Sequence, residues 1–399
     1  MPDPFFAGKR KAKAKRKPSQ TKSGCQGCPL RSGCNSPEMA PYGEGRMGIL
    51  VVGEAPGAKE DECGRPFVGR AGQFFRAELT KLDIDLDRDC LTTNVVQCRP
   101  PDNRTPNDDE VDRCRPRLEK QIEEFEPSLI IALGTPAIQA VLRDAPSKPN
   151  ATLMHGRVVP NILRGCWVAC SFHPSYFVRE KGRFDGRFRE ALSAGLTRYE
   201  EAWTDHRLDP GKYEIIPSAA RLRAVLAGLG KAGPVAFDYE ATCLNPWSPK
   251  AKLLTAAFAD SPDFGYCIPI GHPHAMWKAG EEQEVKEVLA HWLAGPTEKV
   301  IQNWQFEERW SIVHLGTSIA NVVADTMIAE HVLDNRRGVT GQAFQEYVRF
   351  GEADHKNMVV VSALEREFLD TVARYNVLDV RYDIRIHQEQ ERVFDGCAL

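Results

Sequence analysis

Four cysteines in the first third of the chain have the chemistry of metal ligands. Cys25 and Cys28 form a CxxC pair, and Cys98 and Cys114 follow later. Twelve cysteines are many for a chain of 399 residues, and the reducing cytosol disfavours disulfides. Four thiolates suit a tetrahedral zinc ion or a cubane iron–sulfur cluster, because both are soft-ligand sites. Spacing alone leaves both open, and composition alone favours zinc over an iron–sulfur cluster or no metal.

Carboxylates in the second half could bind divalent cations. Asp238 and Glu240 are separated by one residue at the end of an apolar run, so both side chains project from one face of a strand. Tyr375 and Asp379 are four residues apart and share a helical face, and Glu307 adds an acid in a helical pattern. Hard oxygen ligands suit Mg²⁺ or Mn²⁺. Each pair alone is a weak signal, because solvated strand ends commonly carry acids.

The elements that would position the first group alternate between two patterns. Apolar, strand-like runs at residues 49–52, 90–96, 129–133 and 167–172 are separated by helical patterns at residues 71–82, 108–125 and 135–143. This alternation predicts a three-layer α/β unit. The strands end in polar or small residues, namely Glu54, Asn94, Gly134 and His173. Sites in open α/β sheets gather at the carboxyl ends of strands, so we expect these residues to lie close together.

The second half has its own pattern. Strand-like runs at residues 234–240, 253–259 and 266–270 predict a hairpin-rich sheet, and helical patterns follow at about 281–294, 305–315, 323–333, 341–349 and 364–393. Regularity is lost around Pro210-Gly211, which favours a linker. We therefore expect a basic tail at residues 1–23, a first domain at 24–203, a linker at 204–216 and a second domain at 217–399.

Composition bounds the class of protein. Apolar residues make up 42% and charged residues 27%, the balance of a soluble globular protein. The chain has no run of 18 apolar residues and no signal-peptide pattern, so we expect no membrane association and a cytoplasmic location, in a bacterium or a phage-infected host. The net charge is −3, yet residues 9–17 hold seven Lys or Arg, a tail that could neutralise nucleic-acid phosphates.

Five motifs occur in order in the first half: GEAPG at 53–57, GRPFVGRAG at 64–72, TNVVQCRPPDNRTP at 93–106, Cys114, and FHPSYF at 172–177. Together they resemble the family 4, iron–sulfur uracil-DNA glycosylases. The resemblance implies a three-layer α/β/α fold with a central parallel sheet, and hydrolysis of the N-glycosidic bond of uracil in DNA to leave an abasic site. It also implies a [4Fe-4S] cluster, which reverses the preference for zinc, with ligands Cys25, Cys28, Cys98 and Cys114. Cys34 is the one competitor for a ligand position.

The resemblance also implies a uracil pocket. A uracil must leave the base stack, stack on an aromatic face and be contacted along its Watson–Crick edge. Phe67 would be the stacking platform and Asn94 the edge reader, because an amide donates and accepts at once. Backbone groups of Ala55 and Pro56 would line the pocket.

Bond cleavage places negative charge on the departing uracil and positive charge on the sugar. His173 suits the first as a hydrogen-bond donor. Glu54 suits the second, by positioning water or balancing the sugar charge, with Glu60 as an additional candidate. The motifs contain no lysine, so a monofunctional glycosylase without a lyase step is expected.

The carboxylates of the second half, read together with Asp325-Thr-Met327, resemble the proofreading 3′-5′ exonuclease domain of family A DNA polymerases, a DnaQ-like or RNase H-like fold. The resemblance implies that Tyr375 orients the attacking water and that two Mg²⁺ or Mn²⁺ ions are held by Asp238, Glu240, Glu307 and Asp379. Glu307 departs from the family, which has Asp there. Its extra methylene puts catalytic competence in doubt, because metal sites tolerate displacements of only about 0.5 Å.

These expectations combine into a two-domain DNA repair or replication enzyme, a glycosylase followed by an exonuclease. No polymerase segment follows in this sequence, an arrangement similar to the amino-terminal part of certain phage-type polymerases, so a phage role and a DNA polymerase partner are reasonable hypotheses. Two alternatives stay open. In one, the chain is a DNA-binding polymerase accessory protein with a degenerate domain. In the other, it is chiefly an exonuclease, with the glycosylase half as a DNA clamp.

Overall fold

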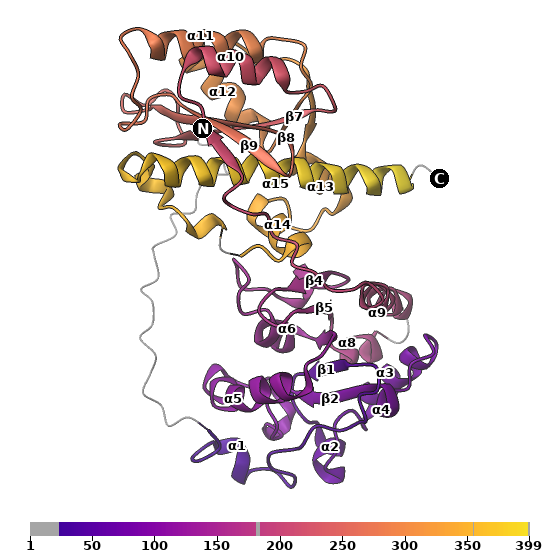
Figure 1. The fold of residues 1–399 in the computed structure, drawn as a ribbon. Coiled ribbons are helices and arrows are strands. Elements are labelled where there is room, and N and C mark those ends of the chain that lie inside the picture. Colours follow the sequence, from indigo (N-terminus) through magenta and orange to yellow (C-terminus); the bar gives the residue numbers. More distant parts are fainter. Residues whose placement is uncertain (1–23, 181–183, 354, 398–399) are drawn as a thin grey trace, which may run out of the picture.

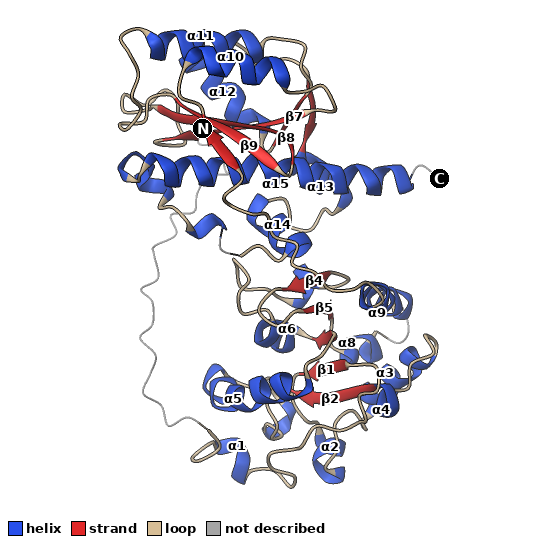
Figure 2. Cartoon of the chain, viewed as in Figure 1, coloured by secondary structure: helices blue, strands red, loops and turns tan. Residues whose placement is uncertain are grey.

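A computed structural model of the chain describes residues 24–180, 184–353 and 355–397. The basic tail expected at residues 1–23 lies outside the described residues. The described chain contains two β-sheets, each covered by helices, and they follow one another along the sequence (Figures 1 and 2). Helix α14 (Gln342–Phe350) lies between them.

The first sheet has the strand order β2-β1-β3-β5-β4. Its strands are β1 (Ile49–Gly53), β2 (Cys90–Asn94), β3 (Leu129–Leu133), β4 (Val158–Asn161) and β5 (Cys166–Ser171). The first four in spatial order are parallel, and β4 is an antiparallel edge strand on β5. Strands β1, β3 and β5 are buried along their whole lengths, which explains why they appear in the sequence as continuous apolar runs.

Alternate residues of the central strands serve the two faces of this sheet. Leu50 and Val52 pack in one core cluster with α5 (Asp108–Phe125) and α6 (Thr135–Val141). Ile49 and Val51 pack in another, with residues of α3 (Arg70–Thr80), α8 (Pro174–Arg179) and α9 (Asp185–Tyr199). The result is a three-layer α/β/α unit. Short helices complete it: α1 (Pro29–Ser32), α2 (Ala58–Cys63), α4 (Leu86–Asp89) and α7 (Ala151–Met154).

The second sheet is mixed, with the strand order β11-β10-β7-β8-β9-β6. Its strands are β6 (Tyr213–Ile215), β7 (Val235–Ala241), β8 (Leu253–Ser261), β9 (Phe264–Pro269), β10 (Lys299–Ile301) and β11 (Val322–Asp325). Antiparallel pairing of β7 with β8 and of β8 with β9 forms the expected hairpins.

Helices cover both faces of the second sheet. On one face, Phe237 and Tyr239 of β7 pack with α10 (Ala219–Gly228), α11 (Glu281–Leu293) and α12 (Trp304–Leu315). On the other, Ala236 packs against the long helix α15 (Leu369–Cys397). Helix α13 (Thr326–Leu333) follows β11, and two short 3₁₀ segments precede α15, His355–Asn357 and Val361–Arg366.

Three elements differ from the sequence-based expectations. Residues 213–215, placed in the linker, form β6 and pair with β9, because the chain is already tied to the second sheet there. Strand β4 was not expected, since Pro160 in a short run resembles a loop; an edge strand tolerates it. Residues 322–325, assigned to a helical pattern, form β11 before α13 begins. Within the described residues, no helix is both long and apolar enough to cross a bilayer.

Candidate active sites

The carboxyl ends of β1 and β2 create a pocket floor. The strands pair in parallel, with Gly53 opposite Asn94. A β-carbon on Gly53 would lie 2.4 Å from Asn94 Oδ1 and 2.8 Å from Phe67 Cζ. Only glycine leaves room for these two side chains, so the structure brings the expected stacking residue and the expected edge reader to one point.

The backbone at Phe67 is held in an unusual conformation. Its φ is +56°, a left-handed value that side chains other than glycine rarely adopt. A β-carbon on Gly72 would lie 2.0 Å from the Phe67 carbonyl oxygen, so the first turn of α3 must approach this backbone closely. The Phe67 ring packs at 5.7 Å from the ring of Phe75. These contacts fix the ring rather than leave it mobile, as a stacking platform requires.

Glu60 joins the two loops of the pocket. Its carboxylate accepts backbone N–H groups from Gly57 at 3.1 Å and from Gly69 at 2.7 Å. Gly57 belongs to the GEAPG loop and Gly69 to the GRPFVGRAG loop, so one side chain holds both in register. Glu60 was named as an additional catalytic candidate; its bonds give it a bracing role.

His173 caps helix α8 just beyond β5. Its Nδ1 accepts the backbone N–H of Ser175 at 3.3 Å and lies 2.9 Å from the Ser175 hydroxyl. Burial lowers the pKa of His173 to about 4. The imidazole is therefore neutral at physiological pH, and because Nδ1 accepts, Nε2 carries the proton. The contact by which Ser175 orients the His173 ring could not be predicted from the motif FHPSYF.

Glu54 directly follows β1 and lines the same cavity. Burial raises its pKa above the ordinary value of 4.5, while a hydrogen bond with Thr105 opposes that shift. The cavity has a volume of about 330 Å³, within the range of small-molecule sites, and its lining includes Glu54, Ala55, Pro56, Phe67, Asn94 and His173. A second groove of about 910 Å³ shares Glu54 and His173 and includes Arg143, Lys148 and Arg179, which suits an anionic strand.

The four expected cluster cysteines line one small cavity. Cys25 and Cys28 precede α1, Cys98 follows β2, and Cys114 lies in α5. Backbone N–H groups point at two of the sulfurs, Glu38 N to Cys98 at 3.2 Å and Gln97 N to Cys114 at 3.4 Å.

Charge explains why this cysteine cavity suits a metal centre. Burial raises the pKa of Cys98 to about 12 and also raises the pKa of Cys114. Two such thiolates are unfavourable without a compensating cation, and metal ligation deprotonates thiols. Cys34, the competitor for a ligand position, bonds the Arg31 carbonyl at 3.9 Å and neighbours Cys98.

The carboxylates of the second half meet between β7 and α15. Asp238 and Glu240 occupy the face of β7 opposite Phe237 and Tyr239, so they point toward α15. One ligand oxygen from each of Asp238, Glu240 and Asp379 lies within 4.8 Å of the others. The Asn376 amide donates to Asp238 at 2.7 Å.

Mutual repulsion within this group means that it could hold a cation. Burial, followed by the nearby charge of Asp379, raises the pKa of Asp238 to about 7. Burial and the same neighbours raise the pKa of Glu240 well above its ordinary range. A divalent cation would relieve both effects, and carboxylate oxygens are the ligands that Mg²⁺ and Mn²⁺ prefer.

Glu307 is buried beside Asp238. It lies in the first turn of α12, and burial with the Asp238 charge raises its pKa well above normal. Among the described residues its Oε2 atom has no hydrogen-bond partner. A buried carboxylate oxygen without a partner is costly, so a cation is a fitting partner. The structure thus brings Glu307 to the acidic group despite its extra methylene.

Asp325 positions the turn that leads into α12. Its carboxylate accepts the backbone N–H groups of Asn303 at 3.2 Å and Trp304 at 2.9 Å. It also caps α13 by accepting the N–H of Met327 at 2.9 Å. These bonds give Asp325 a structural role, and its strand β11 is separated by β10 from β7, which carries Asp238 and Glu240.

Sequence reasoning missed three charged residues at this site. Asp383, one helical turn after Asp379, is fully buried, and burial with the charges of Asp238 and Asp379 raises its pKa well above normal. The i, i+4 spacing could have found it. His355 and Lys356 face Asp379, with Lys356 Nζ in direct contact with its carboxylate. Tyr375 lies near Lys356, its hydroxyl 3.5 Å from Nζ.

Comparison with known proteins separates the two halves. Residues 40–197 match the family model described as the uracil DNA glycosylase superfamily, and residues 213–394 match that of the 3′-5′ exonuclease. The type-4 uracil-DNA glycosylase of Pyrobaculum aerophilum is 36% identical over 197 residues, covering 47% of this chain and 94% of the relative. That of Thermotoga maritima is 39% identical over 159 residues, covering 39% and 79%.

One relative spans both halves. The DNA polymerase of Bacillus phage SP01 is 23% identical over 317 residues, covering 76% of this chain and 34% of the polymerase. Among solved structures, Escherichia coli RNase D has a TM-score of 0.35 at 15% identity, covering 46% of each chain. The two family matches confirm the sequence-based expectations for the fold: a three-layer α/β/α domain is followed by an RNase H-like exonuclease domain.

Proposed function

The chain belongs to the type-4 uracil-DNA glycosylases and carries a 3′-5′ exonuclease domain, and we propose here which residues perform the two reactions. It excises uracil from DNA, and its second domain degrades DNA from the 3′ end. The matched ranges support domain boundaries at 24–203 and 217–399, although β6 adds residues 213–215 to the second sheet.

Phe67 and Asn94 bind the extruded uracil. The fixed Phe67 ring offers a face for stacking, and Asn94 offers one acceptor and two donors to the O4 and N3–H edge. Cytosine presents the opposite donor pattern there, so it would leave buried polar groups unpaired. Backbone groups of Ala55 and Pro56 line the same cavity. The glycine at position 53 supports this assignment, since any larger residue would displace both side chains.

His173 and Glu54 act on the bond. As the C1′–N1 bond breaks, its electron pair goes to the uracil, and the neutral His173 donates a hydrogen bond from Nε2 to the developing oxyanion. The ionised Glu54 stabilises positive charge on the sugar and accepts a proton from the water that forms the new C1′–O bond. The products are a uracil anion, an abasic site and protonated Glu54, which returns its proton to solvent.

Cys25, Cys28, Cys98 and Cys114 fit a [4Fe-4S] cluster better than a zinc ion. A single zinc ion holds its four sulfurs roughly 3.8 Å apart, since Zn–S bonds are about 2.3 Å long. Of the described residues, no three thiols bring their sulfurs within 4.8 Å of one another. When bound, the cluster would supply a cross-link rather than reaction chemistry. The four cysteines would then hold the 24–34 segment against the loop that follows Asn94.

Asp238, Glu240, Glu307 and Asp379 fit two Mg²⁺ or Mn²⁺ ions. The raised pKa values of Asp238, Glu240 and Glu307, caused first by burial, and the unpartnered oxygen of Glu307 favour cations. When bound, two such ions stabilise the attacking and leaving oxygens of a phosphodiester. Tyr375 would orient the attacking water from the same face of α15 as Asp379.

The single observation that carries the glycosylase assignment is the convergence of Phe67, Asn94, Glu54 and His173 on one cavity. A labelled oligonucleotide with one uracil, treated with the protein and then with alkali, tests it. We expect a break at the uracil and none in the matched thymine oligonucleotide. Uracil DNA that stays intact with the cluster present would contradict the assignment.

A polymerase accessory role is the second candidate, favoured by two observations. Glu307 replaces the Asp of the exonuclease family, and the phage polymerase relative spans both domains. The chain would then bind DNA beside a DNA polymerase partner. Uracil excision with no Mg²⁺-dependent nucleotide release, together with faster extension by a polymerase, would favour this candidate.

A further inference from the structure

Helix α14 has two buried faces that belong to different domains. Phe344, Tyr347 and Val348 pack in the core cluster of the glycosylase sheet, together with residues of β1, β3 and β5. Gln342 and Glu346, one turn apart, lie on the opposite side of the helix and contact the exonuclease site. Figure 1 shows α14 between α15 and β4. One helix is thus shared by the two domains.

Specific contacts hold the face of α14 that carries Phe344, Tyr347 and Val348, here called the outer face, to the glycosylase domain. The Tyr347 hydroxyl donates to Asp144 at 3.0 Å. The Arg157 guanidinium lies over the Phe344 ring at 5.0 Å, and it also bonds Asp334, at the end of α13, at 2.5 Å. At the end of the helix, a β-carbon on Gly351 would lie 2.5 Å from the carbonyl oxygen of Pro160. Glycine at position 351 thus lets the end of α14 approach β4 closely.

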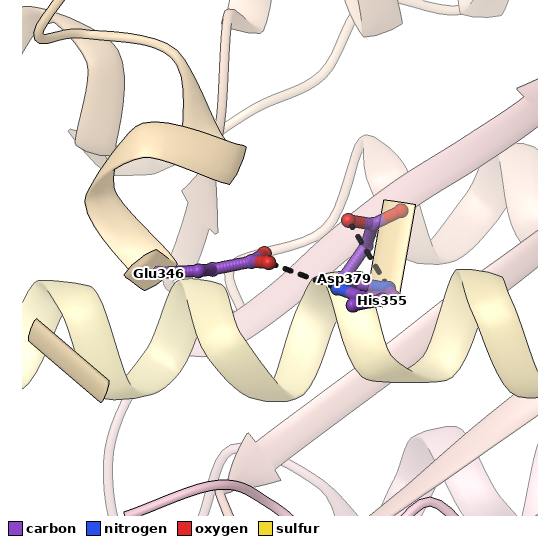
Figure 3. A group of neighbouring side chains, drawn as sticks. All are labelled: Glu346, His355 and Asp379. Carbon is purple, nitrogen blue, oxygen red and sulfur yellow. Dashed lines mark hydrogen bonds and ion pairs between the residues drawn. The ribbon is translucent and has the colours of Figure 1, made fainter. Parts of the chain in front are cut away.

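The opposite face of α14, which carries Gln342 and Glu346 and is here called the inner face, is connected to Asp379 through His355. Glu346 Oε2 lies 3.0 Å from His355 Nδ1, and His355 Nε2 lies 3.7 Å from Asp379 Oδ1 (Figure 3). The same Nε2 lies 3.1 Å from the Tyr375 carbonyl oxygen. Glu346 and His355 are 1% and 2% exposed. In addition, the Gln342 side chain donates to the Asp379 carbonyl at 3.0 Å.

Glu346, His355 and Asp379 also satisfy the distances of a metal site, with ligand atoms within 4.8 Å. The hydrogen bonds favour another role. Each ring nitrogen of His355 faces an oxygen acceptor, a carboxylate on one side and a carbonyl on the other, so both nitrogens act as donors. A donor nitrogen has no lone pair for a cation. The group is therefore a chain of hydrogen bonds that ends beside a proposed metal ligand.

We propose that α14 is a positioning element for the exonuclease reaction, held by the glycosylase domain: Glu346 orients Asp379 through His355, and the outer face of the same helix is anchored in the glycosylase core. The inference deepens the proposed function, because it rests on Asp379 as a metal ligand. Groups that orient metal ligands commonly change metal affinity by about 10- to 100-fold when removed. Loss of the contacts between α14 and the glycosylase domain should therefore weaken cation binding at Asp379, which lies 29 residues beyond Phe350 at the end of α14.

The test measures Mn²⁺ binding to the full chain by EPR of the free ion, and defines the site as the binding lost in Asp238→Ala. Glu346→Leu keeps the side-chain volume but removes the acceptor, so its Mn²⁺ affinity should fall about tenfold. Glu346→Gln keeps an acceptor for His355 and should stay within about threefold of the unaltered chain. The kcat for nucleotide release should fall in the variant whose Mn²⁺ affinity falls, and the KM for DNA should be unchanged.

A second pair of variants tests the anchoring. Arg157→Met removes the contacts to Asp334, Glu330 and the Phe344 ring but leaves the carboxylates of the exonuclease site in place, and should weaken Mn²⁺ binding about threefold. Arg189→Met is the matched control, because Arg189 pairs with Glu78 inside the glycosylase domain. It should leave Mn²⁺ affinity unchanged. Uracil excision by every variant reports that the glycosylase half is folded.

The outcomes separate the proposals. Equal Mn²⁺ affinity in Glu346→Leu and the unaltered chain would overturn the positioning role, and so would an equal loss in Glu346→Leu and Glu346→Gln, which would show an effect of charge alone. No effect of Arg157→Met would overturn the anchoring. If the unaltered chain has no Mn²⁺ site that Asp238→Ala removes, both this inference and the proposed cation site are wrong.

Discussion

Gly53 and Asn94 face each other at the ends of two parallel strands, so closely that a β-carbon on Gly53 would lie 2.4 Å from Asn94 Oδ1. The backbone of β1 thus forms the floor on which the amide of Asn94 and the ring of Phe67 rest. The pocket therefore requires glycine at position 53 as well as the side chains of Asn94 and Phe67.

Gly53→Ala should block the uracil pocket. The new methyl group cannot fit beside Asn94 and Phe67, and both would be displaced from the uracil. Mispositioning by about 1 Å can cost on the order of 100-fold, so we expect at least that loss in the rate of uracil excision. Single-turnover assays with a uracil oligonucleotide measure it.

Gly186→Ala is the matched control for this change. Among the residues that the structure describes, a β-carbon there meets nothing within 4 Å, and Gly186 lies on α9, so excision should be unaffected. Nucleotide release from 3′ ends should be unchanged in both variants. An active Gly53→Ala protein would show that Asn94 and Phe67 do not hold the uracil.

The loss of uracil-excision activity at low pH, the acid limb of the pH profile, should depend on the protonation of Glu54. Burial raises its folded-state pKa above 4.5, and the reaction needs the ionised form, so activity should fall as pH drops through a midpoint above 4.5. The protonated form is favoured in the folded state, so this group's contribution to stability falls as pH rises through that same range. Glu54→Gln should be slow and should lose the limb. A profile of kcat/KM against pH that keeps the limb in the variant would exclude Glu54 as its origin.

His155 should make the free energy of unfolding rise with pH between about 4 and 6.5, against the opposing contribution of the buried carboxyls whose pKa values are raised. Burial, followed by the charges of Arg336 and Arg187, lowers the pKa of His155 from 6.5 to about 4. At this residue the unfolded chain therefore binds more protons in this window, so its contribution to the free energy of unfolding increases with pH. A full shift of this size corresponds to about 3 kcal/mol at most, before relaxation of the site.

Urea unfolding of His155→Gln tests this assignment. The slope of the free energy of unfolding against pH should be less positive in the variant than in the unaltered chain across the same pH window. His173, whose pKa is also lowered to about 4, should contribute in the same direction as His155. An identical slope in His155→Gln and the unaltered chain would rule out His155 as a contributor.

The cysteines offer a test of the metal centre. Cys98→Ser should abolish the broad visible absorbance of thiolate-ligated iron in protein purified without oxygen. Cys34→Ser should keep it, because Cys34 is the competitor and Cys98 a proposed ligand. Iron and sulfide analysis completes the measurement. Zinc in place of iron, or loss of colour only in Cys34→Ser, would contradict the proposed ligand set.

Much of the architecture could be predicted because local patterns dominate it. The strands β1, β3 and β5 are buried on both sides and therefore appear as apolar runs, and the ordered motifs place Asn94 and His173 at strand ends. In the second domain, the period of two in Asp238-Tyr-Glu240 predicts the shared face that the structure shows.

What could not be predicted depends on contacts between distant segments. His355 and Lys356 lie in a short 3₁₀ segment with no pattern of its own, and only the packing of α14 and α15 brings them to Asp379. The role of Glu60 required the positions of two loops, and the short edge strand β4 looks like a loop because it contains a proline. Tertiary placement, not residue type, decides these cases.

The most direct measurement uses one DNA strand, labelled at its 5′ end and carrying a single uracil. In EDTA, with the cluster intact, we expect an alkali-labile break at the uracil and no shortening from the 3′ end. With Mg²⁺ we expect stepwise 3′ shortening as well, abolished in Asp238→Ala while the break at uracil persists. A strand that survives alkali unbroken, or the loss of both activities in Asp238→Ala, would contradict an enzyme with two independent sites.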